Sequence, residues 1–413
     1  MNRGSSVPTT SRRLLLATSL VALAAPRTAR AATTQPIAVG ALFPFSGSLS
    51  LLGDESFRGL DLAADACNAA GGLFGRPIAL ARGDANDTAP ATAEAKRLVE
   101  QTKVACVFGS YAASVAVAAS AVTELAGLPY FELDALADAL TERGLKLIFR
   151  SGPLASACGV LSVDSVIDLL VPRWGADRAT LKVALLHEDG PTGSAVAAAQ
   201  EKRCNDRALP HVERIPYPAT TIDMVPLAQR LRGGAPDVVL HTGHVNDVVL
   251  LHRALKQEGW RPRMVIGAGG GYSLNDTAQA LGADFEGVMN VDVTQYRISD
   301  IVAPGVAGVA AAYQRKYGAP PRSGHSLVCY AGARMFFDIA QRTGTFEHDP
   351  FRAAVLAADA PPGSLVGGFG AKFDDKGQNV RALPYLSQWQ QGALVTVAPK
   401  DAAVADLVPM LGG

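Results

Sequence analysis

The sequence predicts an α/β protein built from two doubly wound parallel-sheet lobes. From residue 36, short β-rich runs alternate with amphipathic or alanine-rich helical stretches, which is the pattern of βαβ units. The alternation stops and begins again near residue 181, which indicates a second sheet of similar size. Without the 31-residue leader described below, 382 of the 413 residues remain, too many for one small core.

The first 31 residues have the pattern of an export signal. Arg12 and Arg13 precede an apolar run that is too short to span a bilayer, and Ala29–Ala31 form an A-x-A cleavage pattern. The order Ser-Arg-Arg is similar to a twin-arginine signal, and an ordinary Sec signal with an arginine-rich start fits as well. We therefore expect cleavage before Ala32 and a periplasmic protein.

The charge of the mature chain argues against nucleic acid as a partner. The leader holds five arginines and no acid, so the remainder has 33 basic and 38 acidic residues and a formal charge of −5. Nucleic-acid-binding proteins usually carry a basic patch or stripe, and no such stripe is visible in the sequence.

The five cysteines do not form a metal or redox motif. They are scattered without a C-x-x-C pair, and an odd number leaves at least one thiol free in an exported protein. Which of them pair stays open. Cys106 and Cys329 lie in apolar runs and are expected in the core.

The elements expected in the first lobe follow in regular order. The segment "AAGGLFGRP" is rich in glycine and closed by Pro77, so it ends the first helix. The expected strands are 37–45, 78–85, 104–110 and 129–135, and the expected helices are 55–70, 90–102 and 112–126.

The second lobe repeats the alternation, and two further elements follow it. A long helix is expected over 323–344, and "YLSQWQQGALVTV" predicts a terminal hairpin with its turn at Gln391 and Gly392. The strands expected in the second lobe are 181–189, 212–218, 237–243 and 262–269, and the helices are 192–205, 223–232 and 246–258.

Catalytic and metal-binding signatures are missing from the sequence. We find no G-x-S-x-G, G-x-x-x-x-G-K-[ST] or H-E-x-x-H pattern, and "GAGGGY" at 267–272 lacks the spacing of a dinucleotide loop. Those glycines indicate either a turn or a close approach of a ligand to the backbone. His241, His244 and His252 are expected at a strand end and on the following helix rather than around a metal. We predict no cofactor and no enzyme activity.

Two strand ends of the first lobe are the candidate ligand-binding segments. The run "FGSYAASVA" passes from a strand into a helix through small residues, so its backbone N–H groups and helix dipole suit an anionic group. Glu132 and Asp134 follow a neighbouring strand at the carboxyl edge of the sheet, where open α/β proteins place ligands. As residues two apart in a strand they share a face, and as a pair they suit an ammonium or amide group.

The order of these motifs resembles one family. The run from "IAVGALFPFSGSLSLLGD" to "GGLFGRPIAL" is similar to the opening of the leucine/isoleucine/valine-binding family of periplasmic solute-binding proteins. The match continues through "VACVFGSYAASVAVAASAVTELAGLPYFE", "LTERGLKLIFRS" and "AKFDDKGQN" to "QWQQGALVTVAP". It covers nearly all of the mature chain.

The resemblance implies a type I periplasmic-binding fold, in which two lobes joined by three crossovers close on a ligand. It also implies that the ligand is passed to the permease and ATPase subunits of an ABC importer. The expected division is a leader at 1–31, lobe one at 36–153 plus 292–350, lobe two at 154–291 plus 351–400, and a tail at 401–413.

The family's first-lobe site residues carry over only in part. The serine that holds the ligand carboxylate falls at Ala113, with Ser110 and Ser114 close by. The small and hydroxyl residues that hold the amino-acid backbone fall at Asp134 and Leu136. The hydroxyl partners are therefore replaced. Backbone N–H groups from Tyr111 through Ala112 to Ser114 could still hold a carboxylate.

The second-lobe residues are replaced as well. The family's aromatic falls at His244, and the acid that meets the ligand ammonium falls at Gly269. Glu132 or Asp134 could supply the missing acid from the opposite lobe. Tyr111 and Tyr272 could flank an aromatic or planar ligand.

Three functions are compatible with these patterns. The first is the solute receptor of an importer for a small carboxylate, amino acid or amide. The second is the same clamp acting as a sensor on a regulator, and the third is a periplasmic enzyme. The sequence supplies no nucleophile or metal centre for the third.

Overall fold

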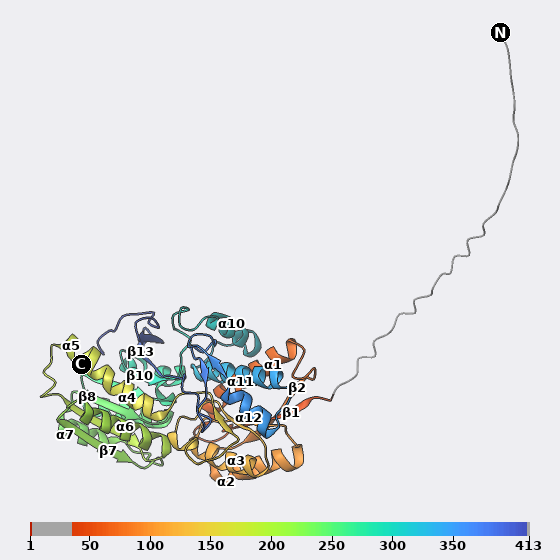
Figure 1. Cartoon of the computed structure of the whole chain (residues 1–413). Coiled ribbons are helices and arrows are strands. Elements are labelled where there is room, and N and C mark those ends of the chain that lie inside the picture. The colour runs from red at the N-terminus through yellow and green to blue at the C-terminus, as the bar shows by residue number, and fades with distance from the viewer. Residues whose placement is uncertain (2–34, 411–413) are drawn as a thin grey trace. The chain divides into compact units, whose positions relative to one another are not determined.

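The computed structural model describes residue 1 and residues 35–410, so the cleavage site expected before Ala32 lies outside the described residues. The first sheet has the strand order β2-β1-β3-β4-β5, and every neighbouring pair is parallel. Its strands are β1 (Ile37–Phe43), β2 (Ile78–Asp84), β3 (Val107–Gly109), β4 (Tyr130–Glu132) and β5 (Ile148–Arg150) (Figure 1).

The second sheet has seven strands in the order β14-β13-β10-β9-β8-β6-β7. From β10 to β7 the strands are parallel, whereas β13 runs antiparallel to both of its neighbours. The strands are β6 (Lys182–Glu188), β7 (His211–Tyr217), β8 (Val238–Thr242), β9 (Met264–Ala268), β10 (Met289–Asp292), β13 (Tyr385–Gln390) and β14 (Ala393–Ala398). The two predicted parallel-sheet lobes are confirmed.

Helices connect the parallel strands in both lobes (Figure 1). A small antiparallel pair, β11 (Asp359–Ala360) and β12 (Ala371–Lys372), follows the last helix. The helices are α1 (Ser50–Ala69), α2 (Thr88–Lys96), α3 (Ala113–Leu125), α4 (Ala155–Ser165), α5 (Val171–Trp174), α6 (Pro191–Asp206), α7 (Val225–Gly234), α8 (Val245–Gln257), α9 (Asn275–Leu281), α10 (Val306–Tyr317), α11 (His325–Thr343) and α12 (His348–Leu356).

The chain passes between the two sheets three times. It leaves the first sheet after β5, returns from the second after β10, and crosses again between β12 and β13. Two of these crossovers are bonded to each other, because the Gln378 amide donates to Gly152 O at 2.9 Å and the Asn379 amide donates to Ser151 O at 3.2 Å. The three crossovers form the hinge that the family resemblance implies.

Separate apolar cores support the two sheets. One cluster joins β1 and α1 to phenylalanines of α11, and another covers the other face of the first sheet with α2 and α3. The second sheet has its own core with α4, α6 and α8. Phe351 and Phe373 pack in the first cluster, so we propose that lobe one extends past residue 350 to about residue 373, beyond the boundary expected from sequence.

One helix begins earlier than expected from sequence, and one long helical run was not among those expected. The first begins at Ser50, five residues before the expected start, because the apolar Leu52 is buried there. The run Ala155–Trp174 is long and apolar enough to cross a membrane by length and composition. Its buried residues, among them Cys158 and Val163, instead pack in the core of the second lobe.

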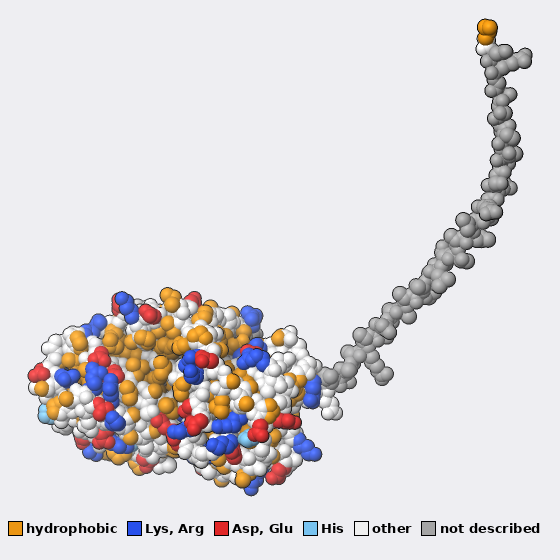
Figure 2. All heavy atoms as spheres, in the orientation of Figure 1, with side chains coloured by type: hydrophobic (Ala, Val, Ile, Leu, Met, Phe, Trp, Pro, Cys, Tyr) orange, Lys and Arg blue, Asp and Glu red, His pale blue; other side chains and the backbone are white. Residues whose placement is uncertain are grey.

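The cysteines and the surface charges follow the chemistry expected from sequence. All five cysteines are buried and unpaired, and Cys106 and Cys329 lie in the core as predicted. On the face shown in Figure 2, lysine and arginine side chains are interspersed with aspartate and glutamate.

Gly59 lets α1 and α11 approach closely, and its replacement by alanine is expected to lower stability. A Cβ at Gly59 would overlap Ser326 O and lie 2.7 Å from Cys329 Cβ, so the helices would have to separate. Overpacking of this kind costs about 1–3 kcal/mol. Urea unfolding would measure the loss. The control is Gly308→Ala in the exposed part of α10, where no atom lies within 4 Å and a gain of about 0.5–1 kcal/mol is expected.

Candidate ligand-binding site

A pocket of about 170 Å³ lies where the carboxyl ends of strands from both sheets meet. Loops after β3 and β4 of the first sheet, after β6, β7, β8 and β9 of the second, and the first residue of α11 surround it. Its lining consists of Leu49, Tyr111, Ala112, Ala113, Ser114, Asp134, Leu136, Glu188, Gly190, Pro191, Thr192, Ala219, Thr242, Gly243, His244, Ala268, Gly269, Gly270 and His325.

A larger hollow of about 790 Å³ lies elsewhere and shares no lining residue with this cavity. Its walls come mainly from α9, the segment after β10 and the β13–β14 hairpin, with Phe285 and Trp389 among them. In open α/β sheets ligands bind outside the carboxyl ends of the strands. We therefore take the smaller cavity, where the strand ends of both lobes converge, as the candidate site.

Eight of the eleven residues singled out from sequence line the cavity, and three do not. Ser110, Glu132 and Tyr272 are fully buried outside the lining. The eight that line it are Tyr111, Ala112, Ala113, Ser114, Asp134, Leu136, His244 and Gly269. The part that each plays in binding remains a prediction.

The N-terminus of α3 faces the cavity without a side-chain cap. Ala112 is the N-cap residue and makes no capping bond, and Ala113 and Ser114 follow it in the lining. The Ser110 hydroxyl donates to Ala112 O at 3.0 Å and so holds the turn rather than facing the cavity. The first backbone N–H groups of α3 are therefore free to donate to an oxygen atom of a ligand.

Glu132 anchors the cavity wall and does not act as a pair with Asp134. Its Oε1 atom accepts N–H bonds from Ser110, Asp134 and Ala135 at 2.7, 2.9 and 2.7 Å. The predicted pair on one face is wrong because β4 ends at Glu132, so Asp134 lies in the loop beyond the strand. Glu132 ties the β3 and β4 loops together, and Asp134 alone reaches the cavity.

Replacing Glu132 by glutamine is expected to remove a pH dependence of stability. Burial raises the pKa of Glu132 to about 7 from its ordinary value of 4.5. The stability that protonated Glu132 gives to the folded state is therefore fully present below pH 4.5, and it is lost as the pH rises through 7. At about 1.4 kcal/mol per pKa unit, the wild type should lose roughly 3 kcal/mol relative to the variant over this range. Urea unfolding of both proteins at pH 4.5, 6 and 8 would measure this loss. If the free energies of unfolding of the two proteins change equally with pH, the prediction is wrong.

Tyr272 and the neighbouring histidines form a buried cluster beside the cavity. The Tyr272 hydroxyl lies 2.6 Å from His241 Nδ1, and the Tyr217 hydroxyl lies 2.9 Å from His241 Nε2. Burial lowers the pKa of both His241 and His252 to about 3, so both imidazoles are neutral at pH 7. Tyr272 packs against His252 and cannot flank a ligand in this arrangement.

Two acids of the second lobe cap helices at the cavity edge. Glu188 Oε1 accepts the Gly193 N–H at 2.6 Å and Oε2 accepts the Gly190 N–H, both in the first turn of α6 or just before it. Asp247 Oδ2 accepts the His244 N–H at 2.9 Å at the start of α8. Negative charge at a helix N-terminus is stabilised by the helix dipole, so these two charges are largely compensated.

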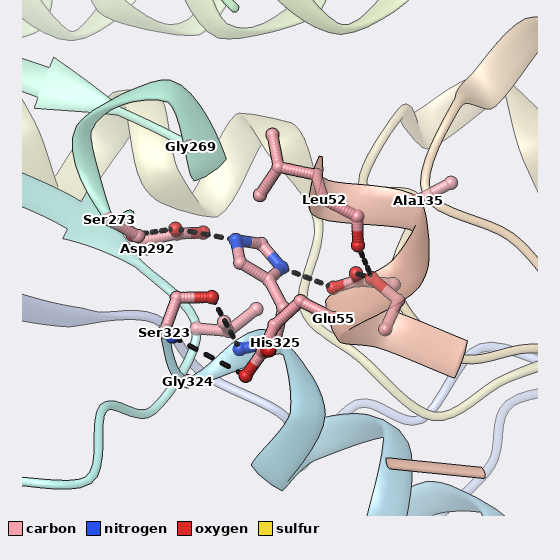
Figure 3. A network of polar contacts seen from close by, with 12 residues as sticks. Leu52, Glu55, Ala135, Gly269, Ser273, Asp292, Ser323, Gly324 and His325 are labelled. Carbon is pink, nitrogen blue, oxygen red and sulfur yellow. Dashed lines mark hydrogen bonds and ion pairs between the residues drawn. The ribbon is translucent and has the colours of Figure 1, made fainter. Parts of the chain in front are cut away.

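His325 lies between two buried aspartates and connects the lobes (Figure 3). Its Nδ1–H donates to Asp134 Oδ1 at 2.7 Å, and its Nε2 lies 3.2 Å from Asp292 Oδ2, an ion pair without good hydrogen-bond geometry. Asp134 also accepts the Ser56 hydroxyl, and Asp292 accepts the Ser273 hydroxyl. Although burial acts in the opposite direction, the two aspartates raise the pKa of His325 well above its ordinary value.

Tyr111 crosses the cleft from the first lobe to the second. Its ring centroid lies 6.2 Å from that of His244 at an interplanar angle of 63°, and 5.5 Å from that of His325 at 79°. Burial raises the pKa of Tyr111 well above its ordinary value, and the charges of Asp292 and Asp134 raise it further. The phenol therefore stays protonated and presents a hydroxyl to the closed cleft.

The sequence analysis missed eleven of the nineteen lining residues, among them the two titratable residues His325 and Glu188. Glu188 is the last residue of β6, at the carboxyl edge of the second sheet, so the strand-end rule that selected Asp134 could have found it. His325 begins a helix 191 residues after its partner Asp134. No local pattern shows that the start of this helix reaches the cleft.

Comparison with known proteins agrees with this architecture. Residues 36–393 match the family model described as periplasmic binding protein. The "Leu/Ile/Val-binding protein homolog 8" of Brucella suis biovar 1 is 44% identical over 397 residues, 96% of this chain and 98% of that protein.

Two solved structures share the fold at low sequence identity. The branched-chain amino acid transporter substrate-binding protein of Streptococcus pneumoniae in complex with isoleucine has a TM-score of 0.74 and 22% identity, covering 88% of this chain and 100% of that one. An ABC transporter solute-binding protein of R. palustris in complex with benzoate has a TM-score of 0.73 and 20% identity, covering 90% and 98%. With two sheets joined by three crossovers around a pocket lined by both lobes, and with the family model matched over residues 36–393, the chain belongs to the periplasmic binding protein family.

Proposed function

We propose that this chain is the exported solute receptor of an ABC importer and that it holds a small amino acid, carboxylate or amide between its lobes. The observation that carries the proposal is the pocket lined by both lobes. Its volume of about 170 Å³ is similar to that of an apolar cavity of about 150 Å³ known to hold benzene, so a ligand with a single ring or short branched chain fits.

The relatives support this class of ligand. The curated relatives are named as Leu/Ile/Val-binding protein homologues, and the two structural neighbours hold isoleucine and benzoate. Each of these ligands combines a carboxylate with a small apolar group. The uncapped N-terminus of α3 offers N–H donors to such a carboxylate, and Ala113 and Leu136 offer apolar contact.

The expected leader supports a binding step outside the cytoplasm. We infer that the leader directs the protein to the periplasm and that the closed, loaded form delivers the ligand to permease and ATPase subunits. A sensor acting on a regulator is the second candidate. An enzyme is disfavoured because the acids in the lining are engaged in fixed hydrogen bonds to helix termini, to Ser56 and to His325.

Thermal unfolding of the mature chain from Ala32 tests the proposal. The probes are isoleucine, benzoate, 3-methyl-2-oxopentanoate and benzamide, each confirmed by calorimetric titration. A ligand at a hundredfold excess over its Kd adds about 2.7 kcal/mol of stability, which raises Tm by several degrees. Recovery of the unchanged probe after long incubation would exclude turnover. Failure of every probe to raise Tm would contradict the proposed ligand class.

A further inference from the structure

The polar side chains that line the cavity carry more negative than positive charge. Asp134, Glu188 and His325 are each no more than 3% exposed and all line it, whereas Asp292 lies directly behind His325. The pKa of the Tyr111 hydroxyl is raised by burial and, in addition, by the negative charges of the nearby acids Asp292, Asp134, Glu188 and Asp247.

These acids differ in how their charge is compensated. Glu188 and Asp247 accept backbone N–H groups at the starts of α6 and α8, so helix dipoles offset their charges. Asp134 lies in the loop after β4, and its carboxyl accepts from side chains rather than from the N–H groups of a helix start. Within residues 35–410 its hydrogen-bond partners are His325, which it shares with Asp292, and the neutral hydroxyl of Ser56.

The group of Asp134, His325 and Asp292 therefore holds one positive and two negative charges in a buried wall. Asp292 Oδ1 is buried and has no hydrogen-bond partner within residues 35–410, so this wall has acceptor capacity to spare. Each oxygen of Asp134 accepts one hydrogen bond and can accept another. A second anion brought beside this wall would be repelled, whereas an N–H donor would be attracted.

We propose that Asp134, held by His325 and Ser56, is the acid that receives an ammonium or amide N–H group of the ligand, so that the receptor selects neutral or zwitterionic ligands over simple carboxylate anions. This rests on the proposed function. In the family, the acid that binds the ligand ammonium comes from the second lobe, and its position in this chain is Gly269. We therefore assign that role to Asp134 of the first lobe. The ligand then lies between Asp134 and the N–H groups that begin α3.

The test compares matched pairs of probes on the mature protein. Isoleucine and 3-methyl-2-oxopentanoate differ by the ammonium group, and benzamide and benzoate differ by an N–H donor in place of an anionic oxygen. In each pair that binds, the wild type is expected to prefer the N–H-bearing member at least tenfold. Calorimetric titration at pH 7 gives the ratio of the two Kd values.

Asp134→Asn and Glu188→Gln separate the roles of the two acids. Asp134→Asn is expected to lower the preference for isoleucine over its 2-oxo counterpart at least tenfold, since it removes the charge that meets the ammonium. Glu188→Gln is expected to change the same ratio less than threefold, because Glu188 caps α6. A ratio within one pair cancels any general loss of affinity that either variant causes.

Each outcome decides a different claim. A wild-type preference for benzoate and the 2-oxo acid would overturn the role of Asp134 and leave the receptor function intact. If none of the four probes binds, both the receptor function as stated and this inference are contradicted. An unchanged ratio in Asp134→Asn would also overturn the inference, and if that variant does not fold, the wild-type ratios alone decide it.

Discussion

Replacing His325 by leucine is expected to lower the free energy of unfolding by about 3–5 kcal/mol at pH 7, the range measured when one partner of a buried ion pair is removed. His325 is 1% exposed and lies 2.7 Å from Asp134 and 3.2 Å from Asp292. Without the imidazolium, the two buried carboxylates keep hydroxyl groups as their only hydrogen-bond partners among the described residues. Urea unfolding of the ligand-free mature protein would measure the loss.

The same variant should change the pH dependence of stability. The pKa of His325 in the folded state lies well above 6.5. The stability that its positive charge gives to the folded state is therefore fully present below pH 6.5, and it is lost as the pH rises through the folded-state pKa. Wild-type stability should therefore fall above pH 6.5, and His325→Leu should lack this part of the slope. Glu132 acts over a different range, from pH 4.5 to about 7, so the two effects are separable.

A triple variant distinguishes charge from packing in this cluster. Adding Asp134→Asn and Asp292→Asn to His325→Leu removes the uncompensated charges, and we expect it to recover a substantial part of the lost stability. If the triple variant is no more stable than His325→Leu, the loss comes from packing. If His325→Leu costs less than about 1 kcal/mol, the ion-pair account of the cluster is wrong.

The alternation of strands and helices is a local signal, and it predicted both parallel sheets. The terminal hairpin was predicted as well, and its turn residues Gln391 and Gly392 both have positive φ, as a tight hairpin turn requires. Local patterns were less informative about element ends. The strand expected to include Asp134 ends at Glu132, because the carboxyl of Glu132 captures the backbone N–H groups of the following loop.

The first-lobe part of the site was predictable because it comes from strand ends that are contiguous in sequence. Tyr111 and Asp134 follow neighbouring strands, and both line the cavity. The second half of the charge network was not predictable, since Asp292 and His325 reach Asp134 only after the chain has crossed the hinge. Tyr272 follows a second-lobe strand too, but its side chain turns into the core because His241 and Phe285 pack around it.

Replacing Gly270 by valine is expected to weaken ligand binding at least a hundredfold while the ligand-free protein keeps nearly its wild-type stability. A Cβ at Gly270 would lie 2.8 Å from the Tyr111 hydroxyl oxygen, 2.8 Å from His325 Nε2 and 2.9 Å from Leu52 Cδ2. Tyr111 and Leu52 belong to the first lobe, whereas Gly270 follows β9 of the second. The added side chain therefore opposes closure of the lobes. Opening at the hinge would relieve the steric overlap.

Calorimetric titration with isoleucine or benzamide, whichever the wild type binds, would measure the loss, and small-angle scattering would show whether the ligand still closes the variant. Gly270→Ala should have a smaller effect in the same direction. Gly271→Ala is the matched control, because its Cβ would overlap Gly243 O within the second lobe. Opening the hinge cannot relieve that overlap, so Gly271→Ala should lower the stability of the ligand-free protein. Wild-type affinity in Gly270→Val would show that binding does not require the lobes to close over Gly270, and the site between them would have to be abandoned.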